Sequence, residues 1–245
     1  MENALLVGLS RQMVLRRELD VVANNVANLN TTGFRADRLL FREHMIPTAR
    51  TDAYGHPDRQ VRFVIDPTTH VDHRAGRFDL SGNEFDLAIQ GEGFFVVETP
   101  RGQRFTRNGA FQKNAQGEIV TAQGYRLLSD AGPVQLQAAD TRFQVGQDGT
   151  ISTENGTRGR VRVVRFEDES QLRKDADQTF STNAQPQPVT ATRVVQGAVE
   201  RSNVEPIVEM SRMIELTRAY QSITSIIERT QDLRRTAIER LAGLN

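Results

Sequence analysis

The stretch LLVGLSRQMVLRRELDVVANNVANL, residues 5–29, decides the fold because its apolar side chains recur at the spacing of one helix face. Counted as a seven-residue repeat from Leu5, it has apolar residues at six of the eight a and d positions, which line a coiled-coil seam. The six residues are Leu5, Leu15, Leu19, Val22, Val26 and Leu29. We therefore expect a long amphipathic helix here.

A second stretch with the same spacing, MIELTRAYQSITSIIERTQDLRRTAIERLAGL, covers residues 213–244. Eight of its ten a and d positions are apolar, and we assign six of them to an assembly seam. These six are Met213, Leu216, Tyr220, Ile223, Ile227 and Leu241. Periodicity alone fits an ordinary core helix equally well, but stripes of roughly 40 to 55 Å favour helices that pair with each other or with neighbouring subunits.

Both predicted helices are bounded by residues that favour helix ends. The first runs into an Asn-rich segment in which Gly33 can adopt a positive φ, as a turn requires. We predict a turn formed by Asn24, Asn25, Asn28, Thr31, Gly33 and Phe34. Before the second helix, Asn203 is placed to act as the N-cap, with Pro206 in the first turn.

Between the two helices the pattern is typical of short strands. Phe85, Leu87 and Ile89 alternate, residues 94–97 are strongly β-prone, and Gly- and Asn-containing turns follow at short intervals. The sequence therefore predicts an α+β fold whose central domain is mostly antiparallel. We expect an N-terminal helical part over residues 1–35, an extended linker over 36–80, the β-domain over 81–200 and a C-terminal helix over 201–245.

Composition excludes several classes of partner. The chain has 245 residues, with 31 Lys plus Arg balanced by 31 Asp plus Glu, so no net charge attracts nucleic acid or an anionic membrane. It has no cysteine, which excludes disulfides and thiolate metal sites. The sequence contains no run of 18 apolar residues, so we predict no membrane insertion. The first residues do not resemble a cleaved signal peptide.

Possible catalytic groups are weaker candidates than solvated loops. His70 and His73, with Asp72 and His56 nearby, have the residue types of a metal site but no helix or turn that would organise one. Residues 167–169 are acidic without an evident division into acid and base, and the glycines at 91 and 93 are not followed by a helix that could bind phosphate. We predict no catalytic residues, no cofactor and no metal. A structural interaction protein is the first hypothesis, and a wall hydrolase of the cell envelope is the alternative.

Three separated segments resemble the bacterial flagellar rod and hook proteins, in the order in which that family carries its motifs. They are residues 23–35, residues 87–95 with 105–111, and Gln196, Gly197, Glu200, residues 202–204, 209–210 and 218–220. The resemblance implies a flagellar axial protein whose terminal helices form an inner coiled-coil layer with the β-domain outside it. It also implies location in the basal-body rod, transmission of motor torque, and type III export. The expected partners are copies of the chain, other rod proteins and the export apparatus.

The spacing of the motifs bears on the place within that family. Only about 50 residues separate Arg35 from Asp86, whereas the resemblance implies a longer segment in the distal rod subunit and additional outer domains in the hook protein. The chain therefore most resembles a subunit of the proximal rod, and a distal rod or hook-type subunit is the alternative.

Overall fold

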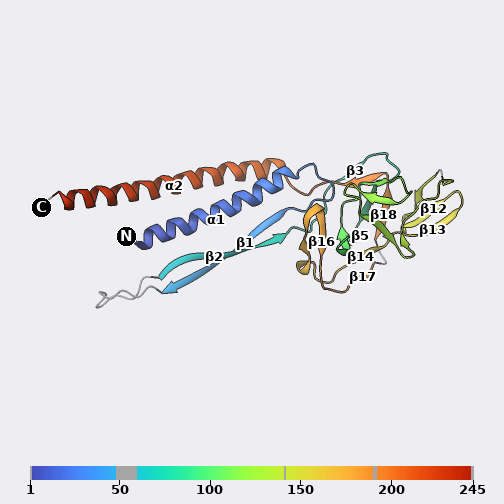
Figure 1. The fold of residues 1–245 in the computed structure, drawn as a ribbon, viewed down its shortest axis with the longest axis horizontal. Helices are drawn as coiled ribbons and strands as arrows, with labels where there is room; N and C mark the ends of the chain where they lie inside the picture. Colours follow the sequence, from blue (N-terminus) through green and yellow to red (C-terminus); the bar gives the residue numbers. More distant parts are fainter. Residues whose placement is uncertain (1, 48–59, 141, 190–191, 244–245) are drawn as a thin grey trace. The chain divides into compact units, whose positions relative to one another are not determined.

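The computed structural model describes residues 2–47, 60–140, 142–189 and 192–243 (Figure 1). Residues 1–27, 37–70 and 205–245 form one compact unit, and residues 28–36 and 71–204 form a second. The terminal helices and the central, largely antiparallel β-region confirm the α+β class.

The first unit is built on two long helices, α1 (Glu2–Ala27) and α2 (Pro206–Ala242). They run in opposite directions side by side (Figure 1), and their contact includes a hydrogen bond from the Gln12 side-chain amide to the Thr224 hydroxyl at 3.1 Å. Neither helix has, within the described residues, the length of apolar sequence that a membrane crossing needs.

The start of α2 corrects the expected capping residue. Glu205 occupies the N-cap position without a side-chain capping bond, and Pro206 is the first helical residue. Asn203 cannot cap the helix because its amide group binds backbone groups elsewhere, as described below. Proline at the start still fits the helix, since it lacks only an N–H group that would have no helical partner.

The segment expected as an extended linker contains paired strands. In the first unit, β1 (Asp37–Pro47) and β2 (Gln60–Val71) form a two-stranded sheet, and their arrows run in opposite directions in Figure 1. The units also divide the sequence differently from the expected domains. Residues 28–36 and 71–80 group with the β-region, while residues 37–70 group with the helices.

The described residues of the second unit form short strands and two 3-10 turns, Glu169–Gln171 and Ala176–Gln178. Its strands are β3 (Phe78–Leu80), β4 (Leu87–Gln90), β5 (Phe94–Thr99), β6 (Gly102–Thr106), β7 (Phe111–Lys113), β8 (Ile119–Thr121), β9 (Arg126–Ser129), β10 (Gly132–Pro133), β11 (Gln144–Val145), β12 (Thr150–Thr153), β13 (Gly156–Arg160), β14 (Val163–Arg165), β15 (Arg173–Lys174), β16 (Thr179–Ser181), β17 (Gln187–Pro188), β18 (Arg193–Gln196) and β19 (Ala198–Glu200). The largest sheet among the described residues runs β15-β16-β6-β5-β9-β8-β7, with β14 also paired to β5. A smaller sheet joins β11, β12 and β13.

Strand β5 lies at the centre of this unit because both of its faces are buried. Phe95 and Val97 pack into one apolar core, and Phe94 and Val96 pack into another. Since successive side chains of a strand point to opposite faces, the run of four apolar residues separates two cores. This explains why the stretch is continuously apolar instead of alternating.

The last strands of the unit return to its beginning. β18 pairs antiparallel with β4, and β19 pairs antiparallel with β3. Residues 193–200 are thereby brought beside residues 78–80 and 87–90. This closure positions the site described next.

Candidate functional site

The seam between α1 and α2 contains most of the predicted seam residues. Leu15, Val22 and Leu216 are buried in it. Partly buried residues packed against these three are Leu19, Val26, Met213, Ala219, Tyr220 and Ile223. The helices therefore bury against each other the faces that the seven-residue repeat indicated.

Leu29 lies outside the seam because α1 already ends at Ala27, and its side chain packs instead against the cluster of Phe34, Ala36 and Val204. The side chains of Leu5 and Leu241 lie outside the described residues.

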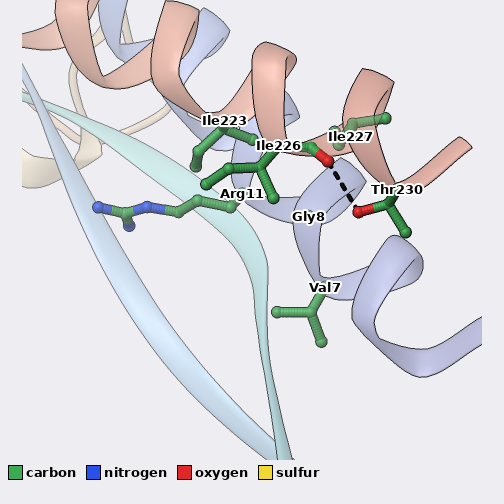
Figure 2. A pocket seen from close by; sticks show the side chains of 7 residues that line it. All are labelled: Val7, Gly8, Arg11, Ile223, Ile226, Ile227 and Thr230. Carbon is green, nitrogen blue, oxygen red and sulfur yellow. Dashed lines mark hydrogen bonds between the residues drawn. The ribbon is translucent and has the colours of Figure 1, made fainter. Parts of the chain in front are cut away.

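A groove of about 280 Å³ opens between the helices beyond the close-packed part of the seam. Figure 2 shows Val7, Gly8 and Arg11 of α1 on one side and isoleucines of α2 on the other, with Thr230 donating its hydroxyl hydrogen bond back to the Ile226 carbonyl at 2.7 Å. A Cβ atom on Gly8 would lie 3.3 Å from Ile227 Cγ1. Glycine therefore lets the two helices approach closely here, next to an open apolar hollow.

Beyond their mutual seam, both helices leave apolar side chains exposed. On α1 these include Leu6, Leu9 and Met13, whose spacing of three and four places them on one face. On α2 they include Ile207, Val208, Met210, Ile214, Ile226, Leu233 and Ile238. Pairing of the two helices therefore satisfies only part of their apolar surface.

The predicted Asn-rich turn is organised by side-chain bonds to the backbone. The Asn25 side chain is buried, where its Nδ2 donates to the Asp37 carbonyl and its Oδ1 accepts from the Asp37 N–H, both at 2.9 Å. The Thr31 hydroxyl donates to Asn28 Oδ1 at 3.1 Å. Asn24 lies exposed on the last turns of α1. The asparagines thus replace backbone partners where the helix ends.

Gly33 turns the chain against the centre of the second unit. Its φ is +68°, and its N–H donates to the Glu200 carbonyl at 2.7 Å. A Cβ atom there would lie 2.4 Å from the backbone carbon of Arg107. Both the backbone angle and the close approach therefore require glycine.

Next to this turn, a buried carboxylate joins the three sequence motifs. Glu200 Oε1 lies 2.8 Å from Arg35 Nη2, and its Oε2 lies 3.2 Å from Arg107 Nη1. The Gly76 N–H also donates to Oε1 at 2.9 Å. Arg35 belongs to the first motif, Arg107 to the second and Glu200 to the third, and all three side chains are buried. We call Arg35, Arg107 and Glu200 the motif junction.

Burial and charge oppose each other in the motif junction. Burial lowers the pKa of Arg35 and of Arg107, and attraction to the Glu200 carboxylate partly offsets the effect in each. Arg107 further donates to the carbonyls of Ile89 and Gly91, at 3.2 and 2.7 Å. Without this carboxylate, the two buried guanidinium charges would lack their counter-ion, which would destabilise the folded unit.

Further bonds hold the chain around the motif junction. Lys174 Nζ donates to the Arg35 carbonyl at 2.9 Å and lies 3.8 Å from the centre of the Phe34 ring. Asn203 Oδ1 accepts from the Ala36 N–H at 2.8 Å, and its Nδ2 donates to the carbonyl of Asp72 at 2.8 Å. Phe34 is thus fixed by an ammonium group on its ring and by apolar packing. The Asn203 side chain thus links the backbone at residue 36 to the backbone at residue 72.

The side chains considered as catalytic candidates differ in their exposure to solvent. His70 and Glu167 are exposed, whereas His73 Nδ1 lies 3.0 Å from Glu169 Oε2 and both side chains are partly buried. The expectation of solvated loops was therefore wrong for His73 and Glu169. Burial raises the pKa of Glu169, although Arg107 and Arg35 act in the opposite direction.

Among the described residues, no group of three or more His, Cys, Asp or Glu side chains is arranged to hold a metal ion. His56 lies outside the described residues. The glycines at 91 and 93 lie between β4 and β5, where the Gly91 carbonyl accepts from Arg107. Their segment thus belongs to the surroundings of the motif junction.

Sequence comparisons cover almost the whole length of the chain. Family models match at residues 5–35, described as flagella basal body rod protein, at 88–153, described as flagellar hook protein FlgE/F/G D1 domain, and at 195–240, described as flagellar basal body rod FlgEFG protein C-terminal. The flagellar basal-body rod protein FlgF of Caulobacter vibrioides is 42% identical over 100% of both chains. FlgF of Mesorhizobium japonicum is 33% identical over 99% of each chain, and FlgG of Bacillus subtilis is 28% identical over 95% of this chain and 97% of its own.

Proposed function

The chain belongs to the FlgF family of flagellar basal-body rod proteins, and we propose that it acts in the proximal rod as a subunit that transmits motor torque. It is a structural subunit of the flagellar basal body that assembles with other axial proteins.

The observation that carries the proposal is the apolar surface that the helix pair leaves uncovered. Leu6, Leu9 and Met13 form an exposed apolar face on α1, and a groove lined by Val7 and by isoleucines of α2 lies between the helices. Removing apolar surface of this kind from water lowers the free energy of the system. We propose that helices of neighbouring axial subunits cover it, so that the seam residues form part of an inner helical layer.

The motif junction supports a role in carrying force. Glu200 and Asn203, which precede α2, bind groups of residues 35–36 and 72–76, which lie beside the start of β1 and the end of β2. Buried, hydrogen-bonded charges leave each other only at a high cost in free energy. The segments that continue into β1, β2 and α2 therefore begin at residues that are bound to one another. A subunit under torque requires such a connection.

We propose that the subunit reaches the rod through the flagellar type III export apparatus, in line with its family. We also propose that it has no catalytic role, because Glu169, whose pKa is raised by burial, is paired with His73 and lies near two arginines. A wall hydrolase would need an acid and a base in separate environments facing a substrate cleft.

The test places a charge on the exposed face of α1. Met13→Asp should leave the purified subunit folded, because Met13 is 66% exposed, but should keep the subunit out of isolated basal bodies. Gln231→Asp places the same charge at an exposed polar position of α2 and serves as the control. Normal incorporation of Met13→Asp would show that this face is not an assembly surface. Release of peptidoglycan fragments by the wild-type chain would favour the hydrolase instead.

A further inference from the structure

Strand β3 carries an isolated apolar patch on the second unit. Among the described residues of that unit, the large apolar side chains that are exposed are Phe78, at 43%, and Leu80, at 87%. Because they are two residues apart in a strand, both point to the same face. Large apolar side chains that lie together on an otherwise polar surface are typical of a contact site.

The backbone of β3 is also open along one edge. Within the described residues β3 pairs with β19 and with no other strand. The Arg201 N–H donates to the Arg77 carbonyl, and the Ser81 N–H donates to the Gly197 carbonyl, both at 2.8 Å. Since the bonding direction alternates in an antiparallel ladder, residues 77, 79 and 81 face β19, and the N–H and C=O groups of Phe78 and Leu80 face away from it.

Apart from its length of only three residues, nothing in the sequence of β3 protects this edge. Proteins usually block an open edge with a lysine, a proline, a bulge or a covering segment. Residues 78–80 contain neither lysine nor proline, and their pairing with β19 is regular. The charged member, Asp79, is bound to Arg201, with Arg201 Nε 2.7 Å from Asp79 Oδ2. The open edge and the apolar patch thus coincide on the same two residues.

The charges beside the strand indicate the chemistry of a partner. Two of the exposed arginines beside it form ion pairs with nearby carboxylates, Arg74 with Asp72 and Arg201 with Asp79. Arg77 is exposed as well, and it adds one positive charge beside this edge. A partner segment that carries a carboxylate would be attracted to it.

We propose that β3 is a docking edge on which an extended segment of a neighbouring axial subunit adds as a further strand. That segment has apolar residues at alternate positions, which cover Phe78 and Leu80, and an acidic residue near Arg77. Main-chain bonds to residues 78 and 80 supply affinity, and the apolar patch sets the register. The inference rests on the proposed function as a rod subunit, but it concerns a surface outside the helices.

The test uses the absence of cysteine from the chain. Leu80→Cys introduces one thiol, which is labelled with a water-soluble maleimide in the purified subunit and in isolated basal bodies. Gln112→Cys is the control, because it lies exposed in β7, a strand of a different sheet from β3. We expect labelling at position 80 to be slower in basal bodies by about tenfold or more, and to slow far less at position 112.

A photoreactive amino acid at position 80 identifies the covering segment in the same preparations. Cross-links to an extended segment of another axial subunit are the expected result. Equal labelling of Leu80→Cys in the free subunit and in basal bodies would overturn the docking edge. Protection accompanied by cross-links to a helix, a lipid or the cell wall would overturn it as well. Absence of the wild-type subunit from the basal bodies would overturn the proposed function together with the docking edge, so the two failures are distinguishable.

Discussion

Arg35 and Glu200 come from opposite ends of the chain, yet their side chains meet at 2.8 Å and each is only 1% exposed. Arg107 completes the motif junction from the middle of the sequence. Each of the three family motifs therefore contributes one charge to a single buried network. The motifs that identify the family are at the same time the parts that close the second unit.

Removal of the shared carboxylate should destabilise the second unit strongly. Glu200→Gln leaves two buried guanidinium groups without their counter-ion, which costs roughly 3 to 5 kcal/mol of unfolding free energy. Urea unfolding of the purified subunit measures the change. Asp79→Asn breaks the exposed ion pair with Arg201 and should cost no more than about 1 kcal/mol. Similar effects of the two substitutions would show that the motif junction does not stabilise the unit.

A comparison of Gly33 with Gly82 distinguishes two reasons for a glycine, a positive φ angle and a lack of space for a Cβ atom. Their φ angles are +68° and +72°, but a Cβ atom on Gly82 would meet no atom within 4 Å, whereas one on Gly33 would meet the backbone of Arg107. Gly82→Ala should therefore cost only the conformational term of about 1 to 2 kcal/mol. Gly33→Ala should cost clearly more in thermal unfolding and should impair swimming in soft agar. Equal melting temperatures would contradict the close approach.

The helix seam predicts a contrast between two neighbouring positions of α1. Leu15 is buried against α2, so Leu15→Ala should cost about 2 to 5 kcal/mol and reduce the helical circular dichroism of the purified subunit. Met13→Ala removes an exposed side chain and should change stability by no more than about 0.5 kcal/mol in the same measurement. A reversed order of the two variants would place the wrong face of α1 in the seam.

Glu169 gives stability a pH dependence of known sign. Because burial raises its pKa, the folded chain binds this proton more tightly than the unfolded chain does. Its contribution is therefore full at low pH and is lost as pH rises through the raised pKa. Glu169→Gln, which cannot ionise, should gain melting temperature relative to wild type as the pH rises from about 4 through the raised pKa of Glu169.

Glu167→Gln, which removes a carboxylate at an exposed position two residues away, is the control for the change of charge. A difference between Glu169→Gln and wild type that stays constant over the same pH range would contradict the assigned effect of burial on Glu169.

The sequence was sufficient for the elements whose pattern is local. Apolar spacing predicted both helices, and the strand-like patterns at residues 85–89 and 94–97 predicted strands where β4 and β5 lie. The positive φ of Gly33 was likewise expected from its position after an Asn-rich helix end. Each of these features depends on interactions within a few residues.

Features that depend on distant partners were not predicted. Arg35, Arg107 and Glu200 lie in separate motifs, and no periodicity indicates that their charges meet. The N-cap assigned to Asn203 was wrong because tertiary bonds to Ala36 and Asp72 take its side chain. Leu29 fitted the seven-residue repeat, but the helix ends before it and tertiary packing takes its side chain into another cluster.

Electron cryomicroscopy of isolated basal bodies tests the central claim most directly, because it locates the subunit and its helices at once. The account predicts this chain in the proximal rod, below FlgG, with α1 and α2 antiparallel in the inner layer and Leu6, Leu9 and Met13 covered by helices of neighbouring subunits. Density that places the chain distal to FlgG, or that leaves the apolar face of α1 exposed, would contradict it.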